Sequence, residues 1–174
     1  MTLFSVEELR KVIGGLVLSG DEAAWGKQRV RRVSLDTRAL RPGDLFIAIQ
    51  GERFDGHDFV KSALVRGAVG AIVHESYDVS LRAGKFLSKR MRPVILGVPD
   101  PLYAYQQLAS YFRGRFKIPI VAVTGSNGKT TTKEMIASIL KAAFGEAVLS
   151  TRGNYNNDIG LPLTLLRLNS GPRA

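Results

Sequence analysis

The sequence predicts an α/β protein, with a small mixed N-terminal domain followed by the start of a phosphate-binding domain built on a parallel sheet. Short β-branched runs alternate with helical patterns over roughly the first 100 residues, which favours a layered α/β arrangement. A second observation is the apolar run at 118–123, which leads through two glycines into a helical pattern. The third is Pro99-Asp100-Pro101, a break between the two stretches.

The expected N-terminal domain covers residues 1–100. Ser5 and Glu8 have the spacing of a capping box, so a helix should begin there and end at Gly14. The pattern of apolar and turn residues predicts strands at 16–18, 29–35, 45–49, 69–73 and 93–98, a helix capped by Asp58 that runs to Arg66, and a loop with one short helix at 76–92.

The expected second domain covers residues 101–174. Asp100 is the expected N-cap of its first helix, with Pro101 in the first turn. The remaining pattern predicts a helix at 102–116, a strand at 118–123, a helix at 133–144, a strand at 148–149 and a helix at 162–168. Strand, helix and strand in this order make a βαβ unit.

The composition excludes several classes of protein. No apolar run approaches the roughly 18 residues of a membrane span, and residues 1–20 lack the apolar core of a signal peptide. We therefore expect a soluble, cytoplasmic protein with no membrane partner. We also expect a monomer, although the composition does not determine the oligomeric state. Because the chain has no cysteine, disulfides and thiolate zinc sites are excluded.

The chain is strongly basic, with 25 Lys and Arg residues against 15 Asp and Glu residues and a formal charge of +10. Nucleic-acid binding is one explanation, because basic clusters occur at 27–32 and 82–92. Neither cluster is interleaved with aromatic residues, and no recognition module such as a zinc finger is present. We therefore expect a solvated basic surface that attracts acidic small substrates, and no nucleic-acid partner.

The segment T-G-S-N-G-K-T-T at 124–131 has the residues of a phosphate-binding loop. The usual spacing G-x-x-x-x-G-K-[ST] fails at Val123, where its first glycine would stand, so the match is to the shorter G-x-x-G-K-T. The candidate nucleotide contacts are Thr124, Gly125, Ser126, Asn127, Gly128, Lys129, Thr130 and Thr131, with Lys129 and Thr130 as candidate catalytic residues and Thr130 as candidate Mg²⁺ ligand.

A second polar segment lies at 34–38. Ser34, Thr37 and Arg38 together suit a diphosphate or a uracil edge, which they would bind through charge-assisted and neutral hydrogen bonds. Alternatively, Asp36 and Arg38 form only a surface ion pair and cap a turn. The residues themselves leave both interpretations open. The two histidines, His57 and His74, show no metal-ligand spacing and are expected to be structural.

A third polar segment follows the strand expected at 148–149. It contains Asn154, Asn156 and Asn157, whose amides both donate and accept hydrogen bonds and so suit a sugar or peptide ligand. Ordinary turn chemistry is the alternative, because Asn is common in loops. The position after a parallel strand favours a ligand-binding role, since open α/β sheets bind ligands at that edge.

These segments resemble the Mur ligase family of bacterial cell-wall synthesis. T-G-S-N-G-K-T-T-T is similar to that family's short phosphate loop. S-L-D-T-R, G-D-L-F-I-A-I-Q-G and D-G-H-D-F are similar to its uridine-nucleotide-binding domain, and T-R-G-N-Y-N-N-D-I-G-L-P-L-T-L-L is similar to its substrate loop. Together these motifs touch nearly the whole chain.

The resemblance implies an ATP- and Mg²⁺-dependent amide ligase that joins D-alanyl-D-alanine to UDP-N-acetylmuramoyl-tripeptide through an acyl phosphate. It places Lys129 on the outer phosphates and Thr130 on Mg²⁺. It further implies that Ser34, Asp36, Thr37, Arg38, Phe46 and Gly51 lie at the UDP part, and that Asn154, Asn156 and Asn157 lie at the muramoyl and peptide part.

The chain departs from the family in length, because the resemblance implies further ATPase residues and a C-terminal domain. We therefore expect an N-terminal fragment that cannot ligate alone. Two other functions stay open: a sister ligase that adds the third residue of the peptide, and a non-catalytic module that binds a UDP-sugar. Nucleic-acid binding is a more distant alternative.

Overall fold

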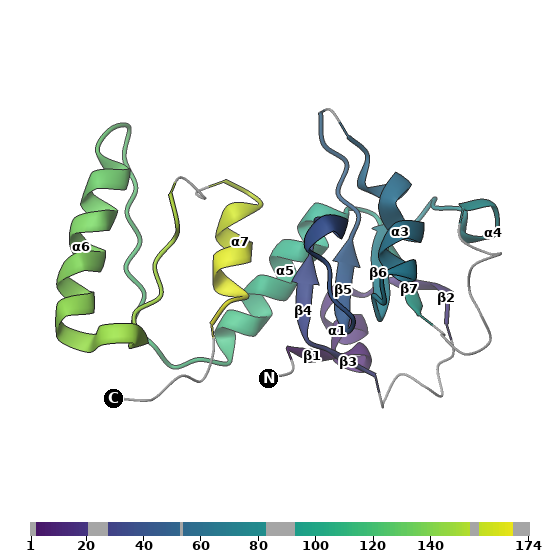
Figure 1. The fold of residues 1–174 in the computed structure, drawn as a ribbon, viewed down its shortest axis with the longest axis horizontal. Helices are drawn as coiled ribbons and strands as arrows, with labels where there is room; N and C mark the ends of the chain where they lie inside the picture. Colours follow the sequence, from purple (N-terminus) through teal and green to yellow (C-terminus); the bar gives the residue numbers. More distant parts are fainter. Residues whose placement is uncertain (1–2, 21–27, 53, 83–92, 154–156, 169–174) are drawn as a thin grey trace. The chain divides into compact units, whose positions relative to one another are not determined.

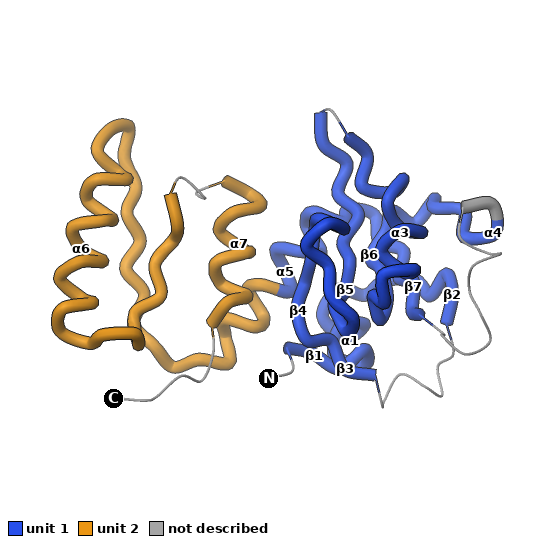
Figure 2. Tube along the Cα trace, viewed as in Figure 1, with its two compact units in different colours: residues 1–108 blue, residues 109–174 orange. Residues whose placement is uncertain are grey.

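The computed structural model describes residues 3–20, 28–52, 54–82, 93–153 and 157–168. The chain divides into two compact units, residues 1–108 and 109–174, so that the division falls within helix α5 (Pro101–Gly114) (Figure 2). The boundary predicted at residues 99–101 stays a prediction.

Unit 1 is built on a five-stranded sheet with the strand order β2-β7-β6-β5-β4 (Figure 1). Its strands are β2 (Leu16–Ser19), β4 (Arg32–Ser34), β5 (Asp44–Ile47), β6 (Gly70–His74) and β7 (Val94–Val98). The last four are mutually parallel, and β2 pairs antiparallel with β7 at the edge. The predicted mixed α/β domain is confirmed.

The central strands are buried on both faces, which explains their continuous apolar sequence. On one face, Phe46, Ala71 and Ile95 pack with Val60 and Ala63 of helix α3 (Val60–Val65). Alternate residues, which point to the opposite face of a sheet, are also buried: Leu45, Ile47, Ile72, Val94 and Leu96.

Helix α1 (Val6–Ile13) begins at the predicted capping box. The Ser5 hydroxyl accepts from the Glu8 N–H at 3.1 Å, and the Glu8 carboxylate accepts from the Ser5 N–H at 2.7 Å. Gly14 ends the helix with φ of 65°, a left-handed conformation that costs glycine little. Local side-chain signals therefore located this helix correctly.

The single strand predicted at 29–35 is wrong, because two short strands replace it. β3 (Arg29–Val30) pairs with β1 (Phe4–Ser5), whereas β4 pairs with β5 in the main sheet. Between them, the Arg31 N–H donates to the Gly43 carbonyl at 3.0 Å. The chain changes sheets at Arg31, a feature set by tertiary pairing and not by the local pattern.

The predicted helix cap at Asp58 is also wrong. Asp55 is the cap: its carboxylate accepts from the His57 N–H at 2.9 Å and begins a 3₁₀ helix, η2 (Gly56–Phe59), which continues directly into α3. The two acids stand three residues apart, and only the first precedes the turn that needs a cap. In the segment 76–92, a short helix α4 (Val79–Arg82) is present, and residues 83–92 lie outside the described residues.

Unit 2 contains the end of α5, helix α6 (Lys129–Phe144), a 3₁₀ turn η4 (Gly145–Ala147) and helix α7 (Gly160–Leu165) (Figure 1). Asp100 caps α5 as predicted, with its carboxylate accepting from the N–H groups of Leu102 and Tyr103. α6 begins four residues earlier than expected, directly at Lys129, and α7 begins at Gly160.

The strands predicted at 118–123 and 148–149 are wrong, because neither segment forms a strand in the structure. A strand exists only through hydrogen bonds to a neighbour, and a parallel strand is normally covered on both faces. Ile120 and Val121 are instead 52% and 60% exposed. The predicted βαβ unit is therefore present only as its helix and two extended flanking segments.

Within the described residues, no helix is long and apolar enough to cross a membrane.

Candidate functional site: a phosphate loop and two polar loops

The phosphate loop lies at the start of α6. Gly125 has φ of 147°, and Gly128 has φ of 76° and stands at the N-cap position of the helix. Nothing approaches the Cβ position of Gly128 within 4 Å, so its glycine is required by backbone conformation and not by crowding. The two glycines turn the backbone so that Lys129 is the first helical residue.

The N-terminus of α6 fits an anion. The first N–H groups of a helix have no partner within the helix, and here no side chain caps them. The first intrahelical bond beside the loop is donated by the Thr132 N–H to the Gly128 carbonyl, at 2.9 Å. The residues of the loop are exposed, so a polyphosphate has access to these donors and to the positive end of the helix dipole.

Lys129 folds back over the loop. Its ammonium donates to the Gly125 carbonyl and, at 3.3 Å, to the Ser126 carbonyl. This position concentrates positive charge directly beside the uncapped helix start. The sequence-predicted residues Gly125 to Lys129 are thus brought together in one turn of chain.

The residues present fit Mg²⁺ only partly. Thr130 is exposed on the first turn of α6 and offers one hydroxyl oxygen. No group of three or more His, Asp or Glu side chains suited to a metal occurs within the described ranges. Mg²⁺ in proteins is commonly held by few protein ligands together with substrate phosphates, so Thr130 fits a metal that arrives with a nucleotide.

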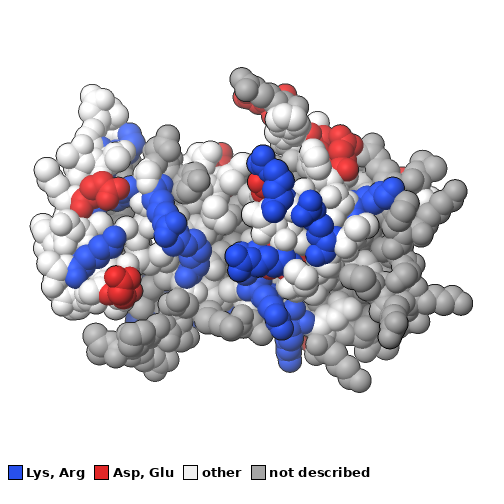
Figure 3. Space-filling model, viewed as in Figure 1, with Lys and Arg blue, Asp and Glu red and all other residues white. Residues whose placement is uncertain are grey.

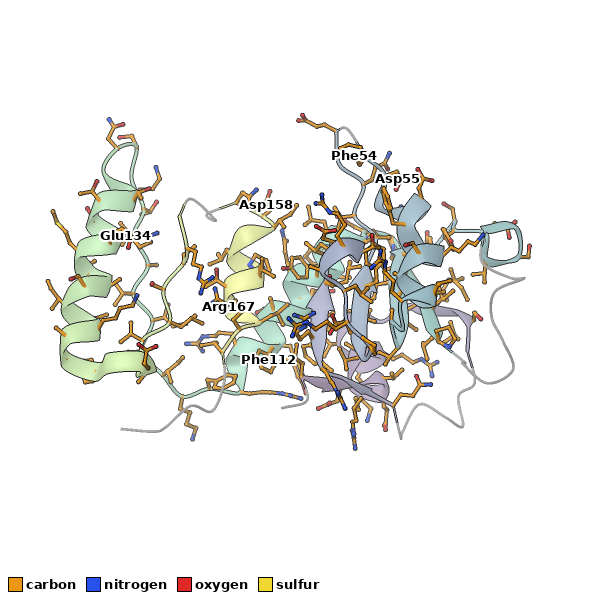
Figure 4. The ribbon with its side chains drawn as sticks, in the orientation of Figure 1. Phe54, Asp55, Phe112, Glu134, Asp158 and Arg167 are labelled. Carbon is orange, nitrogen blue, oxygen red and sulfur yellow. The ribbon has the colours of Figure 1, made fainter. Side chains whose placement is uncertain are left out.

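Lys133, which sequence reasoning missed, links α6 to the third polar segment. Its ammonium donates to the carbonyls of Thr151 and Gly153, both at 2.8 Å, and forms a 2.9 Å ion pair with Glu134. Figure 4 shows Glu134 on α6. This charge lowers the pKa of the Glu134 carboxyl through a hydrogen bond and Coulomb attraction. The sequence offered no signal for these contacts, because their acceptors are main-chain carbonyls, which every residue carries.

The asparagine segment is described only in part. Asn154 and Asn156 lie outside the described residues. The Asn157 side-chain oxygen accepts from the Gly160 N–H at 2.8 Å and so engages the start of α7. At this atom the turn chemistry considered as the alternative is present, and a ligand contact of Asn157 stays a prediction.

In unit 1, the segment 34–38 is held by its own side chains. The Ser34 hydroxyl donates to the Asp36 carbonyl at 2.9 Å. The Asp36 carboxylate accepts from the Arg38 N–H and is the cap of the 3₁₀ turn η1 (Thr37–Ala39). The Arg38 guanidinium pairs with the same carboxylate at 2.8 Å and lowers the pKa of Asp36.

These contacts are the surface pair and turn cap that the sequence left open. The Arg38 side chain is nevertheless 86% exposed, so its outer surface is accessible to an anion. Binding of a diphosphate by Ser34, Thr37 and Arg38 therefore stays a prediction.

The two other residues assigned to the UDP part come from β5 and the loop after it, and Phe46 pairs in register with Ser34 across the parallel strands β4 and β5. Phe46 belongs to β5 and is 1% exposed in the core. Gly51 lies in the following loop, where its N–H donates to the Phe54 carbonyl at 3.0 Å. Figure 4 shows Phe54 and Asp55 in this loop.

The histidines have structural partners. His57 is buried, its Nδ1 lies 2.6 Å from the Asp55 carboxylate, and its Nε2 accepts from the His74 N–H at 2.8 Å. A ring nitrogen that accepts a backbone N–H carries no proton, so Nδ1 is the protonated nitrogen and donates to Asp55. The network fastens the loop before η2 to the end of β6.

Basic side chains are spread over the face shown in Figure 3, and in unit 2 they alternate with acidic ones around α6. Residue 27 and residues 83–92 of the two predicted basic clusters lie outside the described residues, so the expected absence of a nucleic-acid partner stays a prediction.

Comparison with known proteins assigns both parts of the chain to one family. Residues 29–113 match the family described as "Mur ligase family, catalytic domain", and residues 123–173 match "Mur ligase middle domain". The chain is 47% identical over 141 residues to the UDP-N-acetylmuramoyl-tripeptide–D-alanyl-D-alanine ligase of Synechocystis, covering 80% of this chain and 28% of that protein. It is 40% identical over 171 residues to the Haemophilus influenzae ligase of the same name, covering 97% and 34%.

Solved structures similar to this chain belong to the same family. MurF from Acinetobacter baumannii superposes with a TM-score of 0.77 at 35% identity, covering 95% of this chain and 33% of that one. MurF from Thermotoga maritima in complex with ADP gives 0.64 at 39% identity, covering 79% and 29%. The chain spans about a third of the length of these relatives. With both regions matched and the phosphate loop in place, the chain belongs to the Mur ligase family.

Proposed function

We propose that residues 124–131 bind the phosphates of ATP with Mg²⁺, and that the chain serves the ligation of D-alanyl-D-alanine to UDP-N-acetylmuramoyl-tripeptide. The observation that carries this proposal is the uncapped, exposed start of α6 with Lys129 beside it. The names of the relatives support the choice of substrates, and the ADP complex of one structural neighbour supports the nucleotide.

In the proposed reaction, the tripeptide's terminal carboxylate attacks the γ-phosphorus and ADP leaves. The amine of D-alanyl-D-alanine then attacks the acyl phosphate, forming the amide and releasing phosphate. Lys129 and the N–H groups at the start of α6 neutralise charge on the transferred phosphoryl group. Mg²⁺, held by Thr130 together with phosphate oxygens, would supply further charge neutralisation there. We further propose a cytoplasmic, monomeric protein.

Calorimetric titration of this chain with Mg·ADP tests the nucleotide site. We expect Lys129→Met to weaken binding about tenfold or more, because a charge-assisted contact to phosphate is lost. Lys141→Met is the matched control, because Lys141 is an exposed lysine near the other end of the same helix. Equal affinities of the wild type and Lys129→Met would contradict the proposal.

Titration with UDP-N-acetylmuramoyl-tripeptide tests the substrate. We expect Arg38→Ala to weaken this binding, whereas Arg66→Ala, at an exposed arginine after α3, should leave it unchanged. Tripeptide binding without Mg·ADP binding would favour the non-catalytic module instead.

A further inference from the structure

We infer that Lys133 is a positioning residue for the peptide substrate: it fixes residues 151–153 beside α6, and these residues lead into the asparagine segment assigned above to that substrate. The inference rests on the proposed function for the identity of that substrate. The fixing of the segment itself rests only on the geometry of unit 2.

The ammonium of Lys133 has a protein partner for each of its three N–H donors. A lysine ammonium has three N–H donors, and this one contacts the Thr151 carbonyl, the Gly153 carbonyl and the Glu134 carboxylate. Only 19% of the side chain is exposed, although Glu134 beside it is 59% exposed. Lys133 is therefore committed to the protein and does not present its charge to a phosphate.

The two carbonyls bracket one residue, Arg152. A single ammonium bonded at both positions fixes the course of the backbone between them, and bonds to a charged donor are stronger than neutral ones. The segment is thus tied to the second turn of α6, four residues beyond Lys129.

The hydrogen bonds of Lys133 lie near the N-terminal end of α6, the end that carries the phosphate loop. Figure 1 shows the loop before α6, the segment leading to Gly153 and the start of α7 at the same end of this unit. Asn157 engages that start of α7. The two lysines therefore have different roles. Lys129 binds the phosphates of the nucleotide, and Lys133 fixes the backbone of residues 151–153, which lead into the asparagine segment.

Limited trypsin digestion tests the tie on this chain without any ligand. Arg152 is exposed, so the Arg152–Gly153 bond is a trypsin site whose cleavage requires the backbone to leave its fixed course. We expect Lys133→Met to accelerate this cleavage about tenfold, as loss of charged hydrogen bonds should. Lys133→Arg should restore part of the protection, and Lys141→Met should match the wild type. An unchanged rate in Lys133→Met would overturn the inference.

Ligand titration separates positioning from a general loss of structure. We expect Lys133→Met to weaken UDP-N-acetylmuramoyl-tripeptide binding about fivefold while changing Mg·ADP binding less than about twofold, the reverse of Lys129→Met. Faster cleavage with unchanged tripeptide affinity would overturn the positioning role. If the wild type binds neither ligand, the proposed function fails, and the digestion still decides whether Lys133 fixes the segment.

Discussion

Arg32 and Asp44 face each other in register across the parallel strands β4 and β5, and their side chains form a bidentate ion pair. The Arg32 Nε and Nη2 groups each donate to one oxygen of the Asp44 carboxylate. Asp44 is 2% exposed and also accepts from the Arg41 N–H at 2.8 Å, while Arg32 reaches the Ala39 carbonyl at 3.1 Å. The pair therefore connects the residue before the segment 34–38 with residues that follow it. The hydrogen bond to Asp44 raises the pKa of Arg32, which stays charged at any ordinary pH.

Asp44→Asn should lower the free energy of unfolding by about 1–3 kcal/mol. The substitution removes the charge that Arg32 faces, and the cost is moderated because Arg32 reaches solvent. Chemical denaturation followed by circular dichroism measures the change. Glu52→Gln, at an exposed loop position, is the control and should behave as the wild type. Equal stability of both variants would show that the pair is dispensable.

The titration of Asp36 should depend on Arg38. Because the Arg38 hydrogen bonds lower the pKa of Asp36, the stabilisation from this pair is present at neutral pH and is lost as the pH falls through the lowered pKa. Carboxyl NMR should show the pKa of Asp36 below its ordinary value, and Arg38→Met should move it upward. An identical titration in the variant would place Arg38 away from Asp36 in solution.

Gly56→Ala should destabilise unit 1 by about 1–3 kcal/mol, the usual cost of overpacking. A Cβ at this position would lie 2.7 Å from both the nitrogen and the oxygen of Ile49, backbone atoms that cannot move aside cheaply. Gly114→Ala is the matched control, because nothing lies within 4 Å of its Cβ position at the end of α5. Thermal unfolding compares the two, and similar melting temperatures would refute the predicted crowding.

Ser5→Ala should cost about 0.5–2 kcal/mol, the range for loss of a helix N-cap. The substitution removes the hydroxyl that accepts from the Glu8 N–H, whereas the Ser5 N–H keeps its bond to the Glu8 carboxylate. Glu7→Gln removes only an exposed ion pair with Lys11 on the same helix and should be close to neutral. Denaturant titration measures both, and a neutral Ser5→Ala would mean that α1 is held by packing alone.

Much of the fold could be predicted because its signals are local. Ser5, Gly14 and Asp100 each act on the backbone within a few residues, and the helices they bound were located correctly. The errors concern features that depend on distant partners. The break at Arg31 follows from pairing with two different sheets, and the apolar run at 118–123 has a strand's composition without a paired neighbour.

The candidate site divides in the same way. Gly125, Gly128 and Lys129 form one turn of contiguous chain, so their spacing alone located the loop. Lys133 was missed because its partners, Thr151 and Gly153, lie 18 and 20 residues further along the chain. Main-chain acceptors leave no pattern in a sequence, because every residue carries one.

The antiparallel strand at the sheet edge has a consequence for how the protein is made. β2 lies near the start of the chain, yet its partner β7 comes at the far end of unit 1, with Leu16 opposite Gly97. On a ribosome β2 therefore emerges long before β7, the strand with which it pairs. Unit 1 can complete its sheet only after β7 has been translated, so until then β2 has no paired neighbour in the nascent chain.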